Sequence, residues 1–431
     1  MMEKIFSIIL ICTLLINFKY ITKKTGTTNN PSSLYLLIWF LFLFFSLITQ
    51  FSHPINFLAI LYIVVCSNLF CLSIYFFEFN SNKSKIKSNT INIFASKNVL
   101  SFFYILFSVS LLFNFVNLYY QGFDLINVIM DLQSVTSEYT ARRYASDIKP
   151  NFYSQYGLII TYITAIVGGG IVHHRKFKHI NLRGIHILSL SPSLIVMLTQ
   201  GAKGAFFLAI FYFLGGFLLS KSLYNDKNSI KQYFNLYLLF IFSFILLAFL
   251  FFTFLARGND SDSLLLFWYY FSSYSFASLY AFSDWFSFYI NHKSVVSYHF
   301  GDFSYGFETF TSLFKTFGSQ REILPGYYDD YYESHNISTN IYTIYRGLIS
   351  DFSILGSMVA VFLTGFICNT LFFLSRSIKF FRTFYYSLFV MMPAIFYNST
   401  QISLFIWNGT FFLMFALIPI FFLFNKKIKF N

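Results

Sequence analysis

Long apolar runs separated by short polar stretches dominate the 431-residue chain. Most runs approach the roughly 20 residues that a helix needs to cross the hydrocarbon core of a bilayer. We interpret eleven runs as membrane spans. They cover residues 5–18, 33–51, 55–77, 99–120, 154–172, 185–199, 204–220, 233–255, 346–374, 384–397 and 404–424. The expected fold class is therefore all-α, a polytopic membrane protein with about 11 transmembrane helices.

Composition agrees with this interpretation. Hydrophobic residues make up 56% of the chain and charged residues 11%, whereas soluble domains carry about 25% charged residues. The 64 Phe and 32 Tyr are typical of lipid-facing surfaces and interfacial belts. All four cysteines lie inside apolar runs, so they are expected to be small core residues rather than metal ligands.

Lysine and arginine gather in every second connection between the spans. The connections after spans one, three, five, seven and nine, together with the C-terminal tail, hold 20 of the 30 Lys and Arg residues. This alternation predicts that these connections and the C-terminus are cytoplasmic and that the N-terminus lies outside. The formal net charge of +13 is then mostly a topology signal, and it indicates no nucleic-acid partner.

The apolar segment 264–290 tests this assignment, because a single crossing there would reverse the sides of everything that follows. Only Asp284 is charged in it, and serines recur at helical spacing. We interpret the segment as an interfacial or re-entrant helix within one outside loop. A tight double crossing would also preserve the sides.

Three parts of the chain are then expected on the outside: the loop 121–153, the tight turn Gln200–Lys203 and the long loop 257–345. The corresponding division is 1–256 with eight spans, 257–345 as the large external loop, and 346–431 with three spans and the tail. A loop of this length in a compact protein is usually functional or disordered. Because it is aromatic and has a single proline, we expect it to be folded and partly helical.

Several cations lie on this outside face against the general trend. They are Arg142, Arg143, Lys203, Arg257, Arg321 and Arg346. Grouped at the level of the membrane surface, they would attract an anionic group, and arginine suits phosphate because its planar guanidinium donates two parallel hydrogen bonds. We predict a pyrophosphate-binding role for the group. Pairing of single members with nearby acids or lipid headgroups is the alternative.

A second candidate group runs from the long loop into the ninth span, Glu333–Gly356. His335 is a candidate general base, since its ordinary pKa suits removal of a proton from a hydroxyl. Glu333 could orient His335 or replace it. Asp351 is an acid placed within an apolar span, where charges are costly. It is a candidate for catalysis, for pairing with an arginine or for a helix terminus.

The plan of many spans with one long, late outside loop resembles the O-antigen polymerase (Wzy-type) family of oligosaccharide repeat unit polymerases. Thr199–Gly204 (TQGAKG) is similar to the family's turn of small residues followed by Arg-Gly, with Lys203 in place of the arginine. A further similarity is to the pattern N-x-Y-T, D-F-G, G, in which Ser353 replaces a glycine. Its residues are Asn340, Tyr342, Thr343, Asp351 and Gly356.

The resemblance implies a glycosyltransferase of the bacterial inner membrane that acts in polysaccharide or lipopolysaccharide biosynthesis. It would transfer a growing glycan from undecaprenyl or another polyprenyl pyrophosphate to the non-reducing end of a new lipid-linked unit. No cofactor or metal is expected. The implied partners are the lipid-linked oligosaccharide, membrane lipid and a chain-length regulator.

Other functions remain open at this point. An O-antigen ligase shares a related plan, and the pair His335-Asn336 is similar to a pair often found in its loop. A lipid-linked oligosaccharide flippase would carry charges within several spans. A membrane acyltransferase would need a histidine near the cytoplasmic face, where His173 and His174 lie.

Overall fold

A computed structural model describes residues 2–51, 53–79, 93–145, 147–177, 184–223, 264–292, 304–320, 332–334 and 337–426. The chain forms two compact units. Unit 1 comprises Met1–Lys87 and Trp268–Phe422, and unit 2 comprises Ser88–Phe267 and Leu423–Asn431. The regular secondary structure of the described residues is helical apart from one small β hairpin. Unit 1 therefore joins the first helices of the chain with the last ones.

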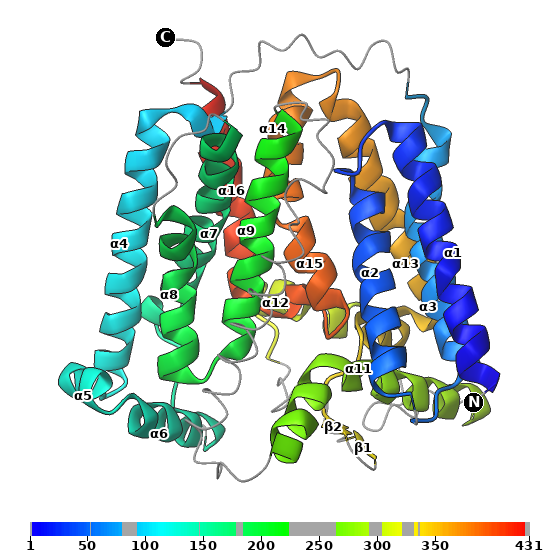
Figure 1. Cartoon of the computed structure of the whole chain (residues 1–431), viewed down its shortest axis with the longest axis horizontal. Helices are drawn as coiled ribbons and strands as arrows, with labels where there is room; N and C mark the ends of the chain where they lie inside the picture. Colours follow the sequence, from blue (N-terminus) through cyan, green and yellow to red (C-terminus); the bar gives the residue numbers. More distant parts are fainter. Residues whose placement is uncertain are drawn as a thin grey trace. The chain divides into compact units, whose positions relative to one another are not determined.

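Unit 1 is a helical bundle with additional short elements at one end (Figure 1). Its elements are α1 (Met2–Thr25), α2 (Pro31–Thr49), α3 (Phe57–Leu72), η1 (Ser73–Phe76), α11 (Leu264–His292), α12 (Phe307–Thr316), β1 (Tyr332–Ser334), β2 (Ile337–Thr339), α13 (Ile344–Ser375), α14 (Lys379–Phe389), α15 (Met392–Ser399), η4 (Leu404–Ile406) and α16 (Asn408–Lys426). The first four residues of α11 and the last four of α16 belong to unit 2.

Seven described helices are long and apolar enough to cross a membrane, which confirms the coarse fold class of a helical membrane protein. They are Met2–Thr25, Pro31–Thr49, Phe57–Phe76, Lys97–Tyr120, Phe152–His174, Lys203–Leu223 and Ile344–Ser375. Two shorter apolar helices, Ile185–Gln200 and Asn408–Phe424, match further predicted spans. The predicted span 233–255 lies outside the described residues.

One predicted span does not form a single helix. The segment 384–397 is divided between α14, which ends at Phe389, and α15, which begins at Met392. Pro393 lies in the first turn of α15, where its missing N–H costs no intrahelical bond. The apolar pattern runs across this break, so hydropathy alone does not show it.

The core of unit 1 is built where α13 crosses α3. At Gly365 a Cβ atom would overlap the carbonyl of Phe70, so the two backbones can approach this closely only because residue 365 is glycine. Four residues later along α13, Asn369 accepts a 2.9 Å hydrogen bond from Ser32 and donates one of 2.9 Å to Ser73. These polar contacts fix the register of α13 against its neighbours.

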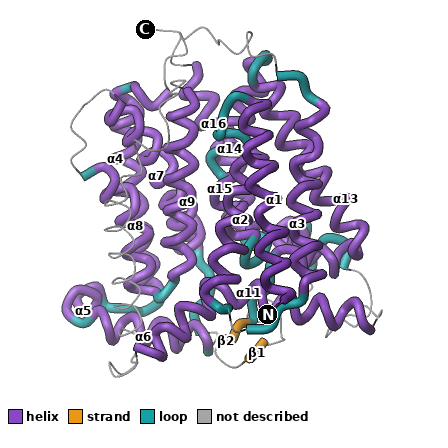
Figure 2. The backbone as a smooth tube through the Cα atoms, turned by 45° about the vertical axis from the view of Figure 1, so that its right-hand side comes forward, coloured by secondary structure: helices purple, strands orange, loops and turns teal. Residues whose placement is uncertain are grey.

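The helix α11 lies at the end of unit 1 where α2 finishes and α3 begins (Figures 1 and 2). Ser283 of α11 accepts a 2.8 Å hydrogen bond from the backbone N–H of Asn56, the N-cap of α3. Tyr280 donates to the carbonyl of Ser46 at 2.9 Å. These contacts support the interfacial interpretation of 264–290, since α11 packs on helix ends. We call this the α11 end of unit 1.

Unit 2 is a second helical bundle. Its described elements are η2 (Ile93–Ala95), α4 (Lys97–Tyr120), α5 (Leu125–Met130), α6 (Leu132–Tyr144), α7 (Phe152–Phe177), α8 (Ile185–Gln200) and α9 (Lys203–Leu223). Glycines allow α7 and α9 to pack closely. A Cβ at Gly169 would overlap the carbonyl of Phe213, and one at Gly216 would overlap that of Ile166.

The short helices α5 and α6 lie at the end of unit 2 where α4 finishes (Figure 1). They fold onto α4 through a small apolar cluster, made of Leu118, Phe123, Val128, Val135 and Tyr139. Asp131 is the N-cap of α6 and accepts a 3.0 Å hydrogen bond from the N–H of Ser134. We call this the α6 end of unit 2.

Candidate functional site

Arg346 is buried at the α11 end of unit 1, with only 4% of its surface exposed. It lies in the first turn of α13. Its guanidinium carbon is 4.0 Å from the centre of the Tyr342 ring and 5.5 Å from that of Trp285 in α11. A cation held over aromatic faces is stabilised by the ring quadrupoles. The predicted cation therefore has a fixed position at the end of a predicted span.

The motif residues around Arg346 lead from the β hairpin into α13. Strands β1 and β2 pair antiparallel, with Glu333 opposite Ser338. Asn340 follows β2, Tyr342 is buried, and Thr343 is the N-cap of α13. The motif thus leads directly into the start of α13, and its Tyr342 provides one of the two aromatic rings that contact Arg346.

Asp351 serves a helix terminus, one of the three roles left open by the sequence. Its carboxylate accepts hydrogen bonds from the N–H groups of Glu308 at 3.0 Å and Thr309 at 2.8 Å, both in the first turn of α12. The Ser304 hydroxyl donates a third bond of 2.6 Å. An anion at this position satisfies free N–H groups and complements the helix dipole. Asp351 thereby fixes α12 to α13.

The backbone conformation at Ser353 accounts for the glycine that the family pattern has at this position. Its backbone has φ 68° and ψ 177°, a region that side chains other than glycine rarely adopt. This residue interrupts the regular geometry of α13 and turns the chain just after Asp351. A glycine would take this conformation without steric cost. Serine adopts this conformation here, and its hydroxyl accepts a 3.3 Å hydrogen bond from the N–H of Gly356.

Arg142 and Arg143 lie in the last turn of α6 at the α6 end of unit 2. Arg142 is 3.5 Å from the carboxylate of Glu138, one helical turn earlier. Its guanidinium is also 5.0 Å from the centre of the Phe123 ring. Arg143 is exposed. Arg142 therefore follows the alternative of local pairing with an acid, and Arg143 is the more accessible cation of the two.

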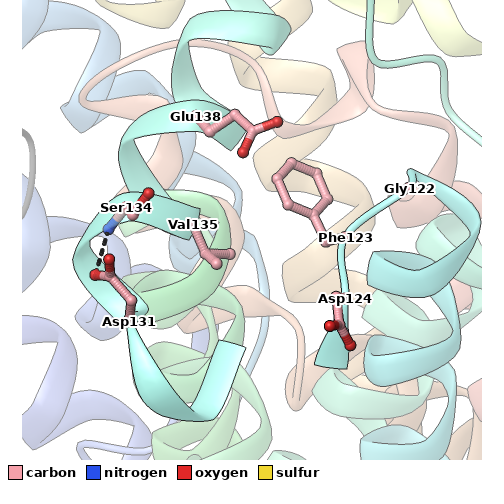
Figure 3. A pocket seen from close by; sticks show the side chains of 7 residues that line it. All are labelled: Gly122, Phe123, Asp124, Asp131, Ser134, Val135 and Glu138. Carbon is pink, nitrogen blue, oxygen red and sulfur yellow. Dashed lines mark hydrogen bonds between the residues drawn. The ribbon is translucent and has the colours of Figure 1, made fainter. Parts of the chain in front are cut away.

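A pocket of about 340 Å³ is lined in part by Phe123 and Glu138, the two residues that contact Arg142 (Figure 3). Its described lining is Gly122, Phe123, Asp124, Asp131, Ser134, Val135 and Glu138. Three carboxylates and no cation are in this lining, so an anion would be repelled. Asp124 and Asp131 also act as local caps, accepting 3.0 Å bonds from backbone N–H groups. This pocket therefore gives no support to a pyrophosphate-binding role for Arg142.

Lys203 begins α9 directly after the tight turn that ends α8. Gly201 has φ 62° and accepts a 3.1 Å bond from the Lys203 N–H, which confirms the predicted turn. Thr136 of α6 donates to the carbonyl of Leu198 near the end of α8. Helix α6 thus packs beside this turn, and Lys203 shares the α6 end of unit 2 with the two arginines.

Three of the predicted site residues, Arg257, Arg321 and His335, lie outside the described residues. In the parts of the chain that the structure describes, no three His, Cys, Asp or Glu side chains come together to hold a metal ion. The metal-independent reaction stays a prediction. Trp285 is the site residue that the sequence did not indicate, because nothing distinguishes it among the aromatic residues of 264–290.

Comparison of the chain with protein-family models, with curated proteins and with solved structures finds no match. The class that the seven long apolar helices define is a polytopic helical membrane protein. A function like that of the polymerase family stays a proposal.

Proposed function

We propose that the protein is an integral-membrane glycosyltransferase that polymerises polyprenyl-pyrophosphate-linked oligosaccharide repeat units. The observation that carries the proposal is the setting of Arg346, a buried guanidinium on two aromatic rings at the end of a span. Cations fixed in advance where charge develops are often the largest contribution to catalysis. The alternation of basic connections and the motif resemblance support the same function.

In the proposed reaction the acceptor hydroxyl of a new lipid-linked unit attacks the anomeric carbon of the growing glycan. The bond from that carbon to the pyrophosphate oxygen breaks, and polyprenyl pyrophosphate leaves. His335 or Glu333 takes the proton of the acceptor hydroxyl. Arg346 stabilises the charge that develops on the pyrophosphate. A role for Arg143 and Lys203 of unit 2 in binding pyrophosphate stays a prediction. This reaction needs no nucleotide sugar.

Burial of charge bears on the flippase alternative. The buried Lys, Arg, Asp and Glu side chains among the described residues are Lys4, Lys221, Arg346 and Asp351. Lys4 and Lys221 lie in the terminal turns of α1 and α9, and Arg346 and Asp351 lie near the start of α13. A transporter typically carries charge near the bilayer midplane. Placement at helix ends favours chemistry at a membrane surface.

The acyltransferase alternative depends on a histidine that is available to substrate. His173 is fully buried in α7, and its Nδ1 lies 3.2 Å from the Ser220 hydroxyl. The contact joins α7 to α9, so it favours a packing role. The ligase alternative shares the donor and the leaving group of the proposal, and only the acceptor differs.

Deletion of the gene separates the candidate functions. For the proposed polymerase, we expect single repeat units on the lipid core and no longer chains on a gel of extracted polysaccharide. A ligase deletion would leave the core without attached repeats. A flippase deletion would accumulate lipid-linked units facing the cytoplasm. Either of the last two results would refute the polymerase proposal.

A further inference from the structure

The short helix α5 presents an apolar face that no described part of unit 2 covers. Ile126 and Met130 are 66% and 80% exposed, and their i, i+4 spacing places them on one side of the helix. Val128, on the other side, is buried in the cluster between α4 and α6. The helix is thus anchored by one face and leaves bulky apolar side chains outside.

Aromatic residues mark the membrane boundary next to this face. Tyr119 and Tyr120, the last residues of the α4 span, are exposed. Across from them, the exposed Phe152 begins α7, and its neighbour Tyr153 lies 5.3 Å from Tyr120 between ring centres. Aromatic belts of this kind occupy the interface between hydrocarbon and water. Helix α5 starts only five residues after Tyr120, so it lies at this level.

We infer that the exposed face of α5 is embedded in the lipid of the bilayer interface and continues the lipid-facing surface of α4. The continuity is direct, because α4 exposes Ile105 and Leu112 along its length and ends in the exposed tyrosines. Helices that lie in the interface insert their apolar face roughly 5–10 Å into the boundary between headgroups and acyl chains. The partner is therefore bilayer lipid rather than another protein.

This position has a consequence for α6. The chain passes from Met130 into α6 through Asp131 alone, and the packing of Phe123 against Tyr139 holds α6 to the same cluster, with 5.4 Å between ring centres. An embedded α5 keeps the exposed Arg143 close to the phosphate level of the bilayer. The inference itself needs only the membrane assignment, so it is independent of the proposed reaction.

The test uses the full-length protein in lipid vesicles with single cysteines at position 126 or 130. Cys12→Ser removes the one exposed native cysteine, while Cys66, Cys71 and Cys368 are buried. Ile126→Cys and Met130→Cys are labelled with an environment-sensitive fluorophore, and Gln133→Cys, on an exposed polar position of α6, is the matched control. Quenching is measured with nitroxide lipids labelled near the headgroup or at the chain end.

We expect blue-shifted emission at both α5 positions and loss of fluorescence with the nitroxide near the headgroup, greater than with the nitroxide at the chain end. The control label should report water. Water-like emission at both α5 positions would overturn the inference. Blue-shifted emission that no lipid nitroxide quenches would also overturn it, because a protein surface rather than lipid would then cover α5.

Discussion

An arginine lies at each end of α13, and both contact two aromatic rings, although Arg346 is buried and Arg376 is half-buried. Arg346 lies over Tyr342 and Trp285 in the first turn. Arg376, the C-cap, lies 4.9 Å from the ring centres of Phe79 and Phe372 and donates a 2.8 Å bond to the carbonyl of Thr25. One end belongs to the proposed site and the other does not. The pair therefore separates the chemistry of an arginine from its contribution to packing.

We expect Arg346→Ala to lower turnover by about 10²–10³-fold, the loss found when a fixed charge-stabilising group is removed. Arg346→Lys should recover part of the activity, because lysine keeps the charge but loses the planar fork. The measurement is glycan polymerisation by purified protein with a synthetic lipid-linked repeat unit, normalised to folded protein.

Arg376→Ala is the control. It should reduce thermal stability through lost packing, yet leave activity per folded molecule near that of the parent protein. If both alanine variants lost activity equally, or if Arg346→Ala retained it, Arg346 would not be part of the reaction.

Asp351 gives the second prediction at the residue scale. Asp351→Asn places an amide N–H₂ against one of the three donors, so the cap of α12 is partly lost. We expect a stability loss of about 1–2 kcal/mol, seen as a lower melting temperature of the solubilised protein. Activity per folded molecule should be retained. Loss of activity at an unchanged melting temperature would instead assign Asp351 to catalysis.

The residues of the site could be predicted only in part. Arg346 and the motif near Asp351 are evident in the sequence, because charge is rare in such apolar surroundings. The partner of Asp351 was not predictable, since α12 begins 44 positions earlier in the chain and its first-turn N–H groups carry no sequence signal. The setting of Arg346 likewise depends on Trp285, a residue on another helix.

At the scale of elements, apolar runs predicted where helices form but not where a helix breaks or bends. The break between α14 and α15 and the bend of α13 at Ser353 both lie within continuous apolar sequence. Backbone geometry there is set by a proline and by tertiary contacts rather than by periodicity. The interpretation of 264–290 as interfacial or re-entrant rests on a different argument, since a single crossing would disrupt the charge alternation.

Close helix packing supplies a prediction at this scale. Gly365→Ala should destabilise unit 1 by about 1–3 kcal/mol, the usual cost of overpacking, because its Cβ overlaps the Phe70 carbonyl. Gly204→Ala is the matched control, since no atom lies within 4 Å of a Cβ there. It should be neutral or slightly stabilising, because alanine favours helix.

The measurement is the melting temperature of the two purified variants, compared with that of the parent protein. Equal melting temperatures for the Gly365→Ala and Gly204→Ala variants would show that α3 and α13 can move apart at this point without loss of stability. The close contact at Gly365 would then contribute nothing to the free energy of unfolding.

At the scale of the whole molecule, the grouping of the helices into two units could not be predicted from the sequence. Unit 1 combines residues from both ends of the chain, and such long-range packing depends on contacts like the one between Ser32 and Asn369, which are 337 positions apart. Hydropathy assigns spans one at a time, without indicating which spans become neighbours. Charge alternation adds the side of the membrane on which each connection lies.

Sidedness is therefore the claim on which the proposed function depends at this scale. The α6 end of unit 2 and the α11 end of unit 1 must face the same side for Arg143 and Arg346 to meet one class of substrate. Each unit offers an exposed position at both of its ends. They are Gln133 and Lys97 in unit 2, and Tyr305 and Ser377 in unit 1.

Single cysteines at these four positions, in the Cys12→Ser background, can be labelled in intact spheroplasts with a membrane-impermeant maleimide. We expect labelling at 133 and 305 and protection at 97 and 377, because the basic connections should be cytoplasmic. Lysis should make all four react. Labelling of 133 but not 305, or the reverse, would place the two cations on opposite sides of the bilayer, and no single pyrophosphate-binding surface could then include both.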